Sequence, residues 1–310
     1  MTPGADARIL VIKHGALGDV VLATGPFAAI RAFHRDAHIV LLTTAPFAET
    51  VRACGYFDEV WEDRRPGWAD PAGWWALRRR LIEGQFDRVY DLQTSDRSSF
   101  YFTLMGPGPR PEWSGIARGA SHPHANPRRD EMHTVERQAE QLKDAGIAVV
   151  PPPALDWLDA DLAVFDLPPR FALLVPGGSA HRPAKRWPVA RYGELGRGLA
   201  ARGVVPVVLG GPPDAGVTAA VARESGGRDL TGATSLAEIV ALARAAAGAV
   251  GNDTGPMHLI ATAGAPSVVL FGHASNPDLC APRGPEVTVL QEDDIATITV
   301  AEVEAALTLR

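Results

Sequence analysis

Short runs of apolar residues alternate along this chain with longer stretches in which apolar positions recur every three or four residues. Short apolar runs are typical of strands buried in a parallel sheet, and the longer spacing is typical of helices that cover such a sheet. The alternation therefore predicts an α/β fold. The expected strands cover residues 8–12, 38–43, 59–61, 88–91, 171–175, 204–209, 247–250, 267–271 and 287–290, and the expected helices of the first half cover residues 26–33, 46–54, 71–83 and 131–145.

Three consecutive prolines, Pro151 to Pro153, interrupt this pattern near the middle of the chain. Such a run continues neither a helix nor a central strand, so it is the best position for a linker. The length of 310 residues also exceeds the usual size of one domain. We therefore expect domains over residues 1–153 and 154–310. A last helix, opened by the capping-box spacing from Thr299 to Glu302, has the option of packing back on the N-terminal domain.

The composition excludes several classes of protein. With 46% hydrophobic and 21% charged residues, each half can bury a core. A net charge of −6 argues against a nucleic-acid partner, because an acidic surface repels a polyanion. The N-terminal residues lack a signal-peptide pattern, and no uncharged apolar run is long enough for a transmembrane segment. Cys54 and Cys280 lie far apart and read as isolated thiols of a reducing compartment, so we expect a cytoplasmic protein.

The stretch Gly251-Asn252-Asp253-Thr254-Gly255-Pro256-Met257-His258 combines turn formers with a helix start. Asp253 or Thr254 can cap the helix, and Pro256 suits its first turn, where a missing N–H costs nothing. The free N–H groups and the positive end of the helix dipole would then face outward at the carboxyl end of a strand. The segment therefore predicts an anion-binding turn that fits a phosphate, with an ordinary capped helix as the alternative.

This segment resembles the signature of the lipopolysaccharide heptosyltransferases, glycosyltransferase family 9. Further segments match that family in the expected order, and the ordered combination is more specific than any one piece. The match is weakest between about residues 110 and 166. The matching segments are Ile9 to Val20 with its glycine loop, Tyr90-Asp91-Leu92-Gln93, Val175-Pro176-Gly177-Gly178-Ser179, Lys185-Arg186-Trp187-Pro188, Leu209-Gly210-Gly211-Pro212, Leu230 to Leu236 and Ser267 to Gly272.

The resemblance implies a GT-B fold, in which two Rossmann-like domains with parallel sheets face a central cleft. In such enzymes the N-terminal domain binds the acceptor and carries the base, and the C-terminal domain holds the nucleotide sugar. The implied reaction is an inverting transfer of a heptose from ADP-heptose to an inner-core lipopolysaccharide acceptor. The alternatives are a related transferase that uses another nucleotide sugar, a nucleotide-sugar epimerase of the same architecture and a non-catalytic nucleotide-binding protein.

The resemblance also assigns donor chemistry to particular residues. Lys185 matches a family lysine and can reach a diphosphate leaving group, whereas its neighbour Arg186 is expected to point outward. Backbone N–H groups of Gly255 and Met257 can donate to the diphosphate. Asp253 would repel a diphosphate, so we expect it to cap the helix, orient the lysine or accept hydrogen bonds from sugar hydroxyls. The other expected donor-binding residues are Gly18, Gly178, Ser179, Asp214 at the ribose, Thr254 and His258.

Asp19 is the candidate general base, because it occupies the position of the family's base in the Leu-Gly-Asp motif of the first loop. In an inverting transfer, a carboxylate takes the proton of the acceptor hydroxyl as its oxygen attacks the anomeric carbon. The alternative is that Asp19 only caps the following helix. His14 departs from the residues expected at its position, and no role is assigned to it.

Basic clusters in the first half of this acidic chain suggest the acceptor side. Guanidinium groups can bind phosphate or carboxylate groups of an anionic glycolipid at the inner membrane surface, which would place the protein peripherally on that membrane. Trp68, Trp74 and Trp75 can lie against sugar rings or the membrane surface. The expected acceptor-binding residues are Arg64, Arg97, Arg118 and Arg128.

We expect no metal and no other cofactor. Asp159-Ala160-Asp161 resembles the metal-binding D-x-D motif of other glycosyltransferases, but it follows the proline linker rather than a strand and reads as a solvated helix turn. Lys185 and the helix start at Thr254 can supply the positive potential that a leaving diphosphate needs.

Overall fold

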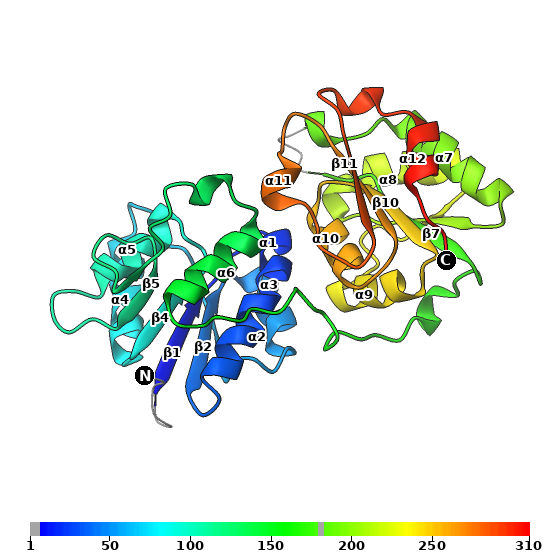
Figure 1. Ribbon diagram of the computed structural model, residues 1–310. Helices are drawn as coiled ribbons and strands as arrows, with labels where there is room; N and C mark the ends of the chain where they lie inside the picture. Colours follow the sequence, from blue (N-terminus) through cyan, green and yellow to red (C-terminus); the bar gives the residue numbers. More distant parts are fainter. Residues whose placement is uncertain (1–6, 179–182) are drawn as a thin grey trace. The chain divides into compact units, whose positions relative to one another are not determined.

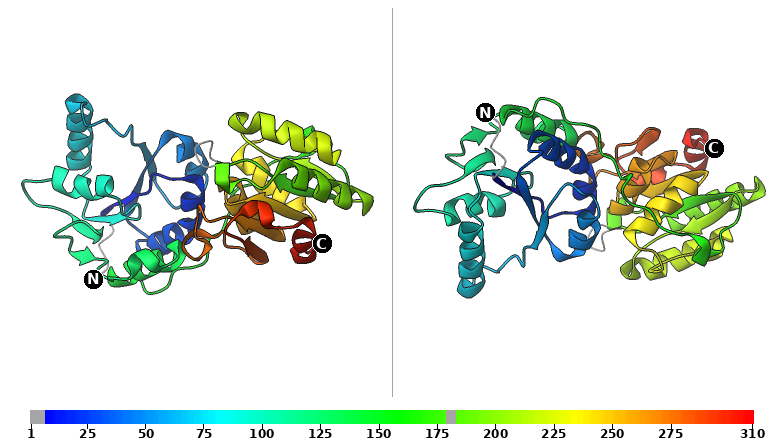
Figure 2. Two further views of the ribbon diagram at one scale, coloured as in Figure 1. Left: turned by 90° about the horizontal axis from the view of Figure 1, so that it is seen from above. Right: turned by 90° about the horizontal axis from the view of Figure 1, so that it is seen from below.

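The computed structural model describes residues 7–178 and 183–310, which form two compact units that meet in sequence between Pro153 and Ala154. Each unit contains one six-stranded sheet whose neighbouring strands are all parallel. Helices cover both faces of each sheet (Figures 1 and 2). The predicted α/β class with parallel sheets is therefore confirmed. Within the described ranges, no helix has the length and apolar character that crossing a bilayer requires.

The elements of the N-terminal unit are β1 (Arg8–Ile12), α1 (Leu17–Leu22), α2 (Thr24–Phe33), β2 (His38–Thr43), α3 (Ala45–Arg52), β3 (Glu59–Glu62), α4 (Pro71–Glu83), β4 (Arg88–Asp91), α5 (Asp96–Leu104), β5 (Glu112–Gly115), β6 (His122–Pro123), η1 (Arg129–Glu131) and α6 (Thr134–Asp144). Successive strand residues point to opposite faces of the sheet. Ile9 and Val11 accordingly pack with α1, α2, α3 and α6, whereas Leu10 and Ile12 pack with α4 and α5.

The strand order of this unit is β3-β2-β1-β4-β5-β6. The chain therefore winds outward in opposite directions from β1 and β4. In such a doubly wound sheet, ligands bind outside the carboxyl ends of the two strands at the reversal point. Asp19 lies in the first turn of α1, the helix that follows β1, so the fold places this residue at such a point.

Several elements of the N-terminal unit differ from those expected. Strands 8–12, 38–43 and 88–91 form as predicted, but α1, α5, β5 and β6 were not predicted. The two missed strands are short and contain Ser, Gly, His and Pro, and their pairing with β4 rather than a local pattern makes them strands. The helix expected over residues 131–145 begins only at Thr134, because the His133 side chain caps it by accepting from the N–H of Val135.

The elements of the C-terminal unit are η2 (Ala163–Phe165), β7 (Phe171–Val175), η3 (Pro183–Lys185), α7 (Val189–Ala201), β8 (Val205–Val208), η4 (Pro212–Asp214), α8 (Ala215–Ser225), β9 (Arg228–Asp229), α9 (Leu236–Ala245), β10 (Gly248–Asn252), α10 (Gly255–Thr262), β11 (Ser267–Phe271), α11 (Pro277–Cys280), β12 (Val287–Gln291), η5 (Ile295–Thr297) and α12 (Val300–Ala306). The strand order β12-β11-β10-β7-β8-β9 again reverses between two central strands, here β7 and β10.

The core of the C-terminal unit lies on both sides of its sheet. On one face, Leu174 and Val250 pack with side chains of α7, α8 and α12, including Val300 and Val303 of the last helix. Helices α9 and α10 cover the other face (Figure 1). This packing fixes the carboxyl ends of β7 and β10 side by side, where their following loops build a pocket.

Candidate active site

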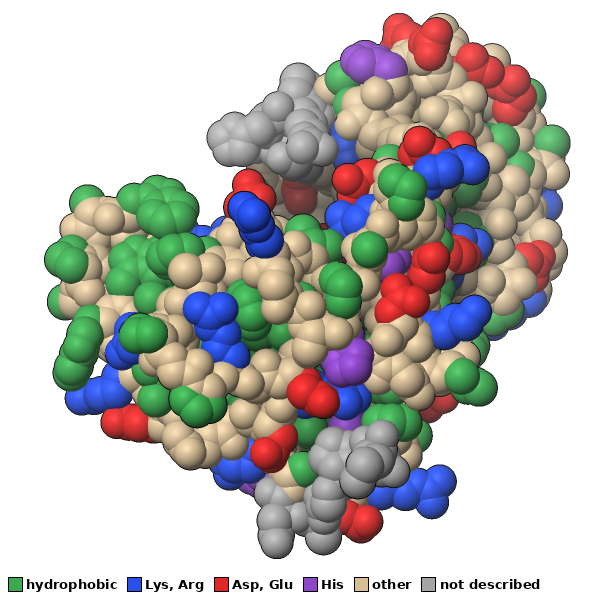
Figure 3. Space-filling model, turned by 60° about the vertical axis from the view of Figure 1, so that its left-hand side comes forward, with side chains coloured by type: hydrophobic (Ala, Val, Ile, Leu, Met, Phe, Trp, Pro, Cys, Tyr) green, Lys and Arg blue, Asp and Glu red, His purple; other side chains and the backbone are tan. Residues whose placement is uncertain are grey.

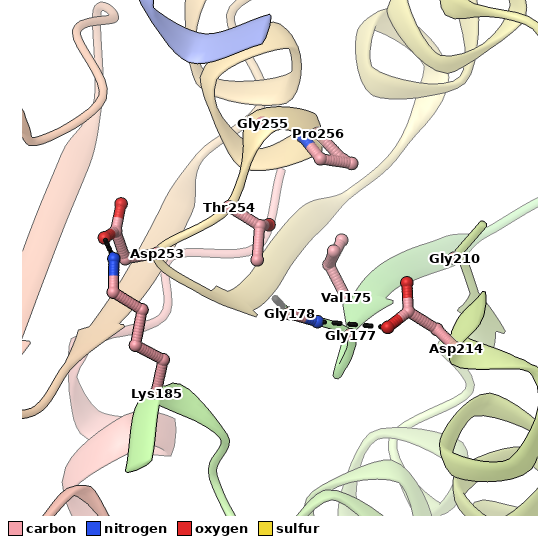
Figure 4. A pocket seen from close by; sticks show the side chains of 10 residues that line it. All are labelled: Val175, Gly177, Gly178, Lys185, Gly210, Asp214, Asp253, Thr254, Gly255 and Pro256. Carbon is pink, nitrogen blue, oxygen red and sulfur yellow. Dashed lines mark hydrogen bonds and ion pairs between the residues drawn. The ribbon is translucent and has the colours of Figure 1, made fainter. Parts of the chain in front are cut away.

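A pocket of about 450 Å³ lies at the carboxyl ends of β7, β8 and β10 in the C-terminal unit (Figure 4). It therefore occupies the reversal point of the sheet, the position at which doubly wound folds bind ligands. Of the residues expected at the donor, six line it: Gly178, Lys185, Asp214, Asp253, Thr254 and Gly255. The other lining residues are Val175, Gly177, Gly210 and Pro256.

Lys185 and Asp253 form an ion pair in this pocket. The Nζ of Lys185 lies 2.5 Å from Oδ2 of Asp253, and the two side chains are only 13% and 8% exposed. Figure 4 shows the lysine extending from its own loop toward the carboxylate. Of the roles considered for Asp253, the geometry favours the orientation of Lys185, because the carboxylate holds the ammonium at the pocket wall.

The start of α10 forms a second wall with free hydrogen-bonding groups. The backbone N–H of Gly255 has no acceptor within the described ranges, and the buried Oγ1 of Thr254 has no partner there either. Both groups can therefore donate to an anion at the positive end of the helix.

Two residues of the same helix differ from the expectation. The N–H of Met257, which was expected to donate to the diphosphate, instead donates to the carbonyl oxygen of Thr254 at 3.1 Å. Met257 is fully buried, and His258 is buried as well. Neither side chain lines the pocket, because both face the packed side of α10.

Asn252 holds the pocket loops together, a role that the sequence did not reveal. Its fully buried amide donates to the carbonyl oxygens of Pro176 and Gly177, at 2.9 and 3.0 Å. Its Oδ1 accepts from the N–H of Trp187 at 3.0 Å and from the hydroxyl of Tyr192 at 3.1 Å. One side chain thus joins β10, the loop after β7 and the segment that follows Lys185. The only sequence signal was its place next to Asp253.

Arg186 does not point outward as expected, because its side chain contacts two residues that line the pocket. Its guanidinium donates to the carbonyl oxygen of Gly178 at 2.6 Å and lies 3.5 Å from the carboxylate of Asp214. The same carboxylate accepts from the N–H groups of Gly178 and Gly211. Asp214 therefore stabilises the two glycine turns of the pocket, and it lines the wall where ribose hydroxyls were expected. Ser179 lies outside the described residues.

In the N-terminal unit, Asp19 lies half-buried in the first turn of α1. Its Oδ2 accepts from the backbone N–H of Ala16 at 3.0 Å, which stabilises the glycine loop in the manner of a helix cap. Its Oδ1 has no partner in the described part of the chain, so one oxygen is available to take a proton. Gly18 is buried in the same turn.

A buried cation lies at the start of this loop. Lys13 follows β1, and its Nζ donates to the carbonyl oxygen of Leu92 at 3.3 Å. Burial lowers the pKa of Lys13, and the carboxylates of Asp19 and Asp91 oppose that effect. Asp91 is itself fully buried, and burial raises its pKa to about 6 although the N–H groups of Gln93 and Thr94 donate to it. The segment that leads to the candidate base therefore contains one buried ionisable side chain, Lys13, and lies close to another, Asp91.

His14 belongs to a buried polar cluster. Its Nε2 lies 2.9 Å from Oδ2 of Asp63, and the hydroxyl of Tyr101 donates to the same oxygen at 2.5 Å. Oδ1 of Asp63 accepts from the N–H of Arg65 at 2.7 Å. Burial alone would raise the pKa of Asp63, but these three donors outweigh it and keep the pKa below its ordinary value. The cluster therefore ties the glycine loop to the loop that carries Arg64.

The expected acceptor arginines do not form one group. Arg97 donates to the carbonyl oxygen of Pro66 at 3.1 Å, which brings it to the loop of the exposed Arg64. Arg118 is exposed after β5. Arg128 is 79% exposed and pairs with Glu131 at 2.8 Å. The structure thus joins the first two arginines through one loop and places the other two in separate segments.

Within the described ranges, no three His, Cys, Asp or Glu side chains are grouped as metal ligands. The Asp159-Ala160-Asp161 segment is irregular and not a helix turn, which corrects that expectation. Asp159 is exposed and lies 3.9 Å from the guanidinium of Arg244.

Comparisons with known proteins agree with this architecture. A family model described as glycosyltransferase family 9 (heptosyltransferase) matches residues 74–306. Lipopolysaccharide heptosyltransferase 2 of Escherichia coli (strain K12) is 37% identical over 120 residues, a stretch that covers 37% of this chain and only 34% of that protein. The match with this curated relative thus spans about a third of its length.

Two solved structures are similar over almost the whole chain. The glycosyl transferase family 9 protein from Veillonella parvula DSM 2008 gives a TM-score of 0.83 at 22% identity, covering 97% of this chain and 96% of that one. The E. coli ADP-heptose lps heptosyltransferase II gives a TM-score of 0.76 at 23% identity, covering 96% and 97%. These similarities establish the fold, and the predicted GT-B type with two Rossmann-like domains is confirmed.

Proposed function

The chain belongs to glycosyltransferase family 9, the heptosyltransferase family, and from this premise we propose that it transfers a heptose from ADP-heptose to an inner-core lipopolysaccharide acceptor. Membership of this family makes it a glycosyltransferase, as the sequence predicted. It also argues against the epimerase and against a non-catalytic nucleotide-binding protein. We further propose that the C-terminal unit binds the donor and that the N-terminal unit binds the acceptor.

The observation that carries the donor proposal is the pocket between the loops of β7 and β10. It offers an ammonium, a helix N–H and a hydroxyl, from Lys185, Gly255 and Thr254. These are the groups that stabilise the charge growing on a departing diphosphate.

In the proposed inverting reaction, Asp19 takes the proton of the acceptor hydroxyl while that oxygen forms a bond to the anomeric carbon. The bond from the anomeric carbon to the diphosphate oxygen breaks, and its electron pair leaves with ADP. Lys185 and the start of α10 stabilise the resulting negative charge. We expect no metal to be needed, because these groups already supply positive potential.

The test is an ADP-release assay with the purified protein, ADP-heptose and a truncated inner-core acceptor that lacks heptose. ADP release that requires the acceptor, with the product one heptose heavier by mass spectrometry, would support the proposal. Acceptor-dependent transfer from a different nucleotide sugar, with none from ADP-heptose, would show that the proposed donor is wrong and that the proposed reaction class is right. Turnover of the nucleotide sugar without any acceptor would instead indicate an epimerase or a hydrolase.

A further inference from the structure

Two strongly exposed tryptophans lie in one short segment of the N-terminal unit. Trp68 is 75% exposed and Trp75 is 60% exposed. Within the described ranges, only Val149 and Val164 are other large apolar side chains exposed to this degree. An exposed indole ring is a feature of binding surfaces, since scattered small apolar groups are common on proteins but clustered large ones are not.

Contacts with neighbouring rings and with the backbone hold Trp68 and Trp74 in place. The ring of Trp68 stacks on that of Trp74, with centroids 5.5 Å apart and an interplanar angle of 26°. The indole N–H of Trp74 donates to the carbonyl oxygen of Gly67 at 2.9 Å, which fixes the loop to α4. The edge of Phe100 meets Trp74 at 5.3 Å. Trp68 is thus held outward by contacts beneath it, so little side-chain entropy is lost when it binds.

Arginine side chains surround these rings. The guanidinium of Arg97 lies 5.2 Å from the ring of Trp74 and 5.7 Å from that of Trp68. The guanidinium of Arg79 lies 5.0 Å from the ring of Trp75. We call these five residues the tryptophan–arginine surface. Figure 3 shows hydrophobic side chains together with Lys and Arg, and few Asp and Glu, on the N-terminal unit at the left of that view.

The charge of this segment is opposite to that of the chain. Residues 64–80 contain five arginines and one aspartate, so their net charge is +4, whereas the whole chain carries −6; Glu83 at the end of the same helix lies 3.7 Å from the guanidinium of Arg79. A local positive charge beside exposed indole rings matches an interface between water and anionic lipid. Indole rings favour the headgroup level of a bilayer, and arginines are attracted to its negative surface.

We propose that the tryptophan–arginine surface docks the protein on an anionic membrane surface. The inference deepens the proposed function, because a lipid-linked acceptor is presented at such a surface. Trp68 and Trp75 insert at the headgroup level while Arg79 contacts lipid phosphates together with its exposed neighbour Arg80, whose guanidinium lies 4.3 Å from the centre of the Trp61 ring. Binding of this kind needs no spanning helix.

The test is sedimentation of the full chain with phosphatidylcholine vesicles that either contain or lack phosphatidylglycerol. No donor or acceptor is added, so the result does not depend on the proposed reaction. We expect binding to the anionic vesicles that weakens as salt is raised. Trp68→Ser with Trp75→Ser should weaken it at least about tenfold, by loss of apolar area from the interface. Val149→Ser with Val164→Ser is the control and should bind as the parent does.

The charge contribution has its own pair of variants. Arg79→Gln with Arg80→Gln should weaken binding to anionic vesicles by about fivefold for each guanidinium removed. Arg202→Gln with Arg223→Gln changes two exposed arginines of the C-terminal unit and should leave binding unchanged. Trp68→Phe with Trp75→Phe should keep most of the binding but lose the fluorescence quenching that brominated lipids cause in the parent.

Four outcomes would overturn the proposal. The first is equal binding to vesicles with and without anionic lipid, and the second is equal loss in the Trp variant and in the valine control. The third is no vesicle binding together with a concentration-dependent dimer that the Trp variant loses, which would assign the surface to a second copy of the chain. Transfer to a delipidated acceptor should stay unchanged in the Trp variant. A raised KM for that acceptor, without any loss of vesicle binding, would assign the rings to sugar stacking.

Discussion

Replacement of Lys185 by alanine tests the leaving-group chemistry most directly. The ammonium lies 2.5 Å from the Asp253 carboxylate, inside a pocket lined by two glycine turns and the start of α10. Loss of one preorganised donor to a developing anion costs about 2.7–4 kcal/mol in enzymes where it has been measured. We therefore expect transfer to slow by about 100- to 1,000-fold in Lys185→Ala.

The ion pair makes a second effect calculable. Lys185→Ala leaves the Asp253 carboxylate, 8% exposed, unpaired at the pocket wall. Two unit charges about 4 Å apart interact by about 4 kcal/mol at an effective dielectric constant of about 20, and solvent in the open pocket reduces this value. The bare carboxylate should therefore repel the diphosphate. Addition of Asp253→Asn to Lys185→Ala should restore ADP affinity by about tenfold, because the repulsion is removed.

Isothermal titration calorimetry with ADP, together with initial rates, measures both effects. Lys143→Ala is the control, since Lys143 is an exposed lysine of α6 in the N-terminal unit. Unchanged ADP affinity in Lys185→Ala would place the lysine outside the binding site. ADP affinity in the double variant no better than in Lys185→Ala would refute the repulsion argument and return Asp253 to another role.

Further expectations concern the base, the metal, a buried acid and the loop anchor. Asp19→Asn should lower kcat by about 10²–10⁴-fold with nearly unchanged ADP affinity, and equal turnover would assign Asp19 to helix capping alone. Transfer should survive EDTA, and loss that magnesium or manganese restores would make Asp253 a candidate metal ligand. Burial raises the pKa of Asp91 to about 6 in the folded protein, above its value near 4 in the unfolded chain. The folded state therefore binds this proton more tightly than the unfolded state does. The resulting stabilisation is fully present below about pH 4 and is lost as the pH rises through about 6. Asn at this position keeps an acceptor oxygen but does not titrate. Between pH 4 and 7, the free energy of unfolding of Asp91→Asn should therefore rise by about 3 kcal/mol relative to that of the parent. Urea unfolding at several pH values measures both, and the same pH dependence in the two proteins would contradict this expectation. Asn252→Ala should lower the free energy of unfolding by at least about 2 kcal/mol and lower the Tm, because it leaves a buried N–H donor and buried carbonyl groups unpaired. An unchanged Tm would show that water replaces the amide.

The sequence by itself determined the central strands, the fold class and the segments that meet at the pocket. Buried parallel strands are continuous apolar runs, so strands such as Arg8–Ile12 and Ser267–Phe271 could be read directly. The glycine turns and the proline at the start of α10 are also local signals, since each depends on the backbone of its own few residues. These features predicted where Lys185 and Thr254 would be found.

Only the tertiary structure decided which side chains face one another. The pairing of Lys185 with Asp253 joins residues far apart in the chain, and no local pattern states whether a carboxylate will cap a helix or hold an ammonium. The strand order brings the ends of β7 and β10 together. This arrangement lets Arg186 lie beside Asp214 and lets the amide of Asn252 contact three segments. The edge strands β5 and β6 likewise depend on β4 for their hydrogen bonds. Contacts of this kind depend on the order of the strands in the sheet. A single sequence predicts the elements and their succession along the chain, but it does not state which strands become neighbours.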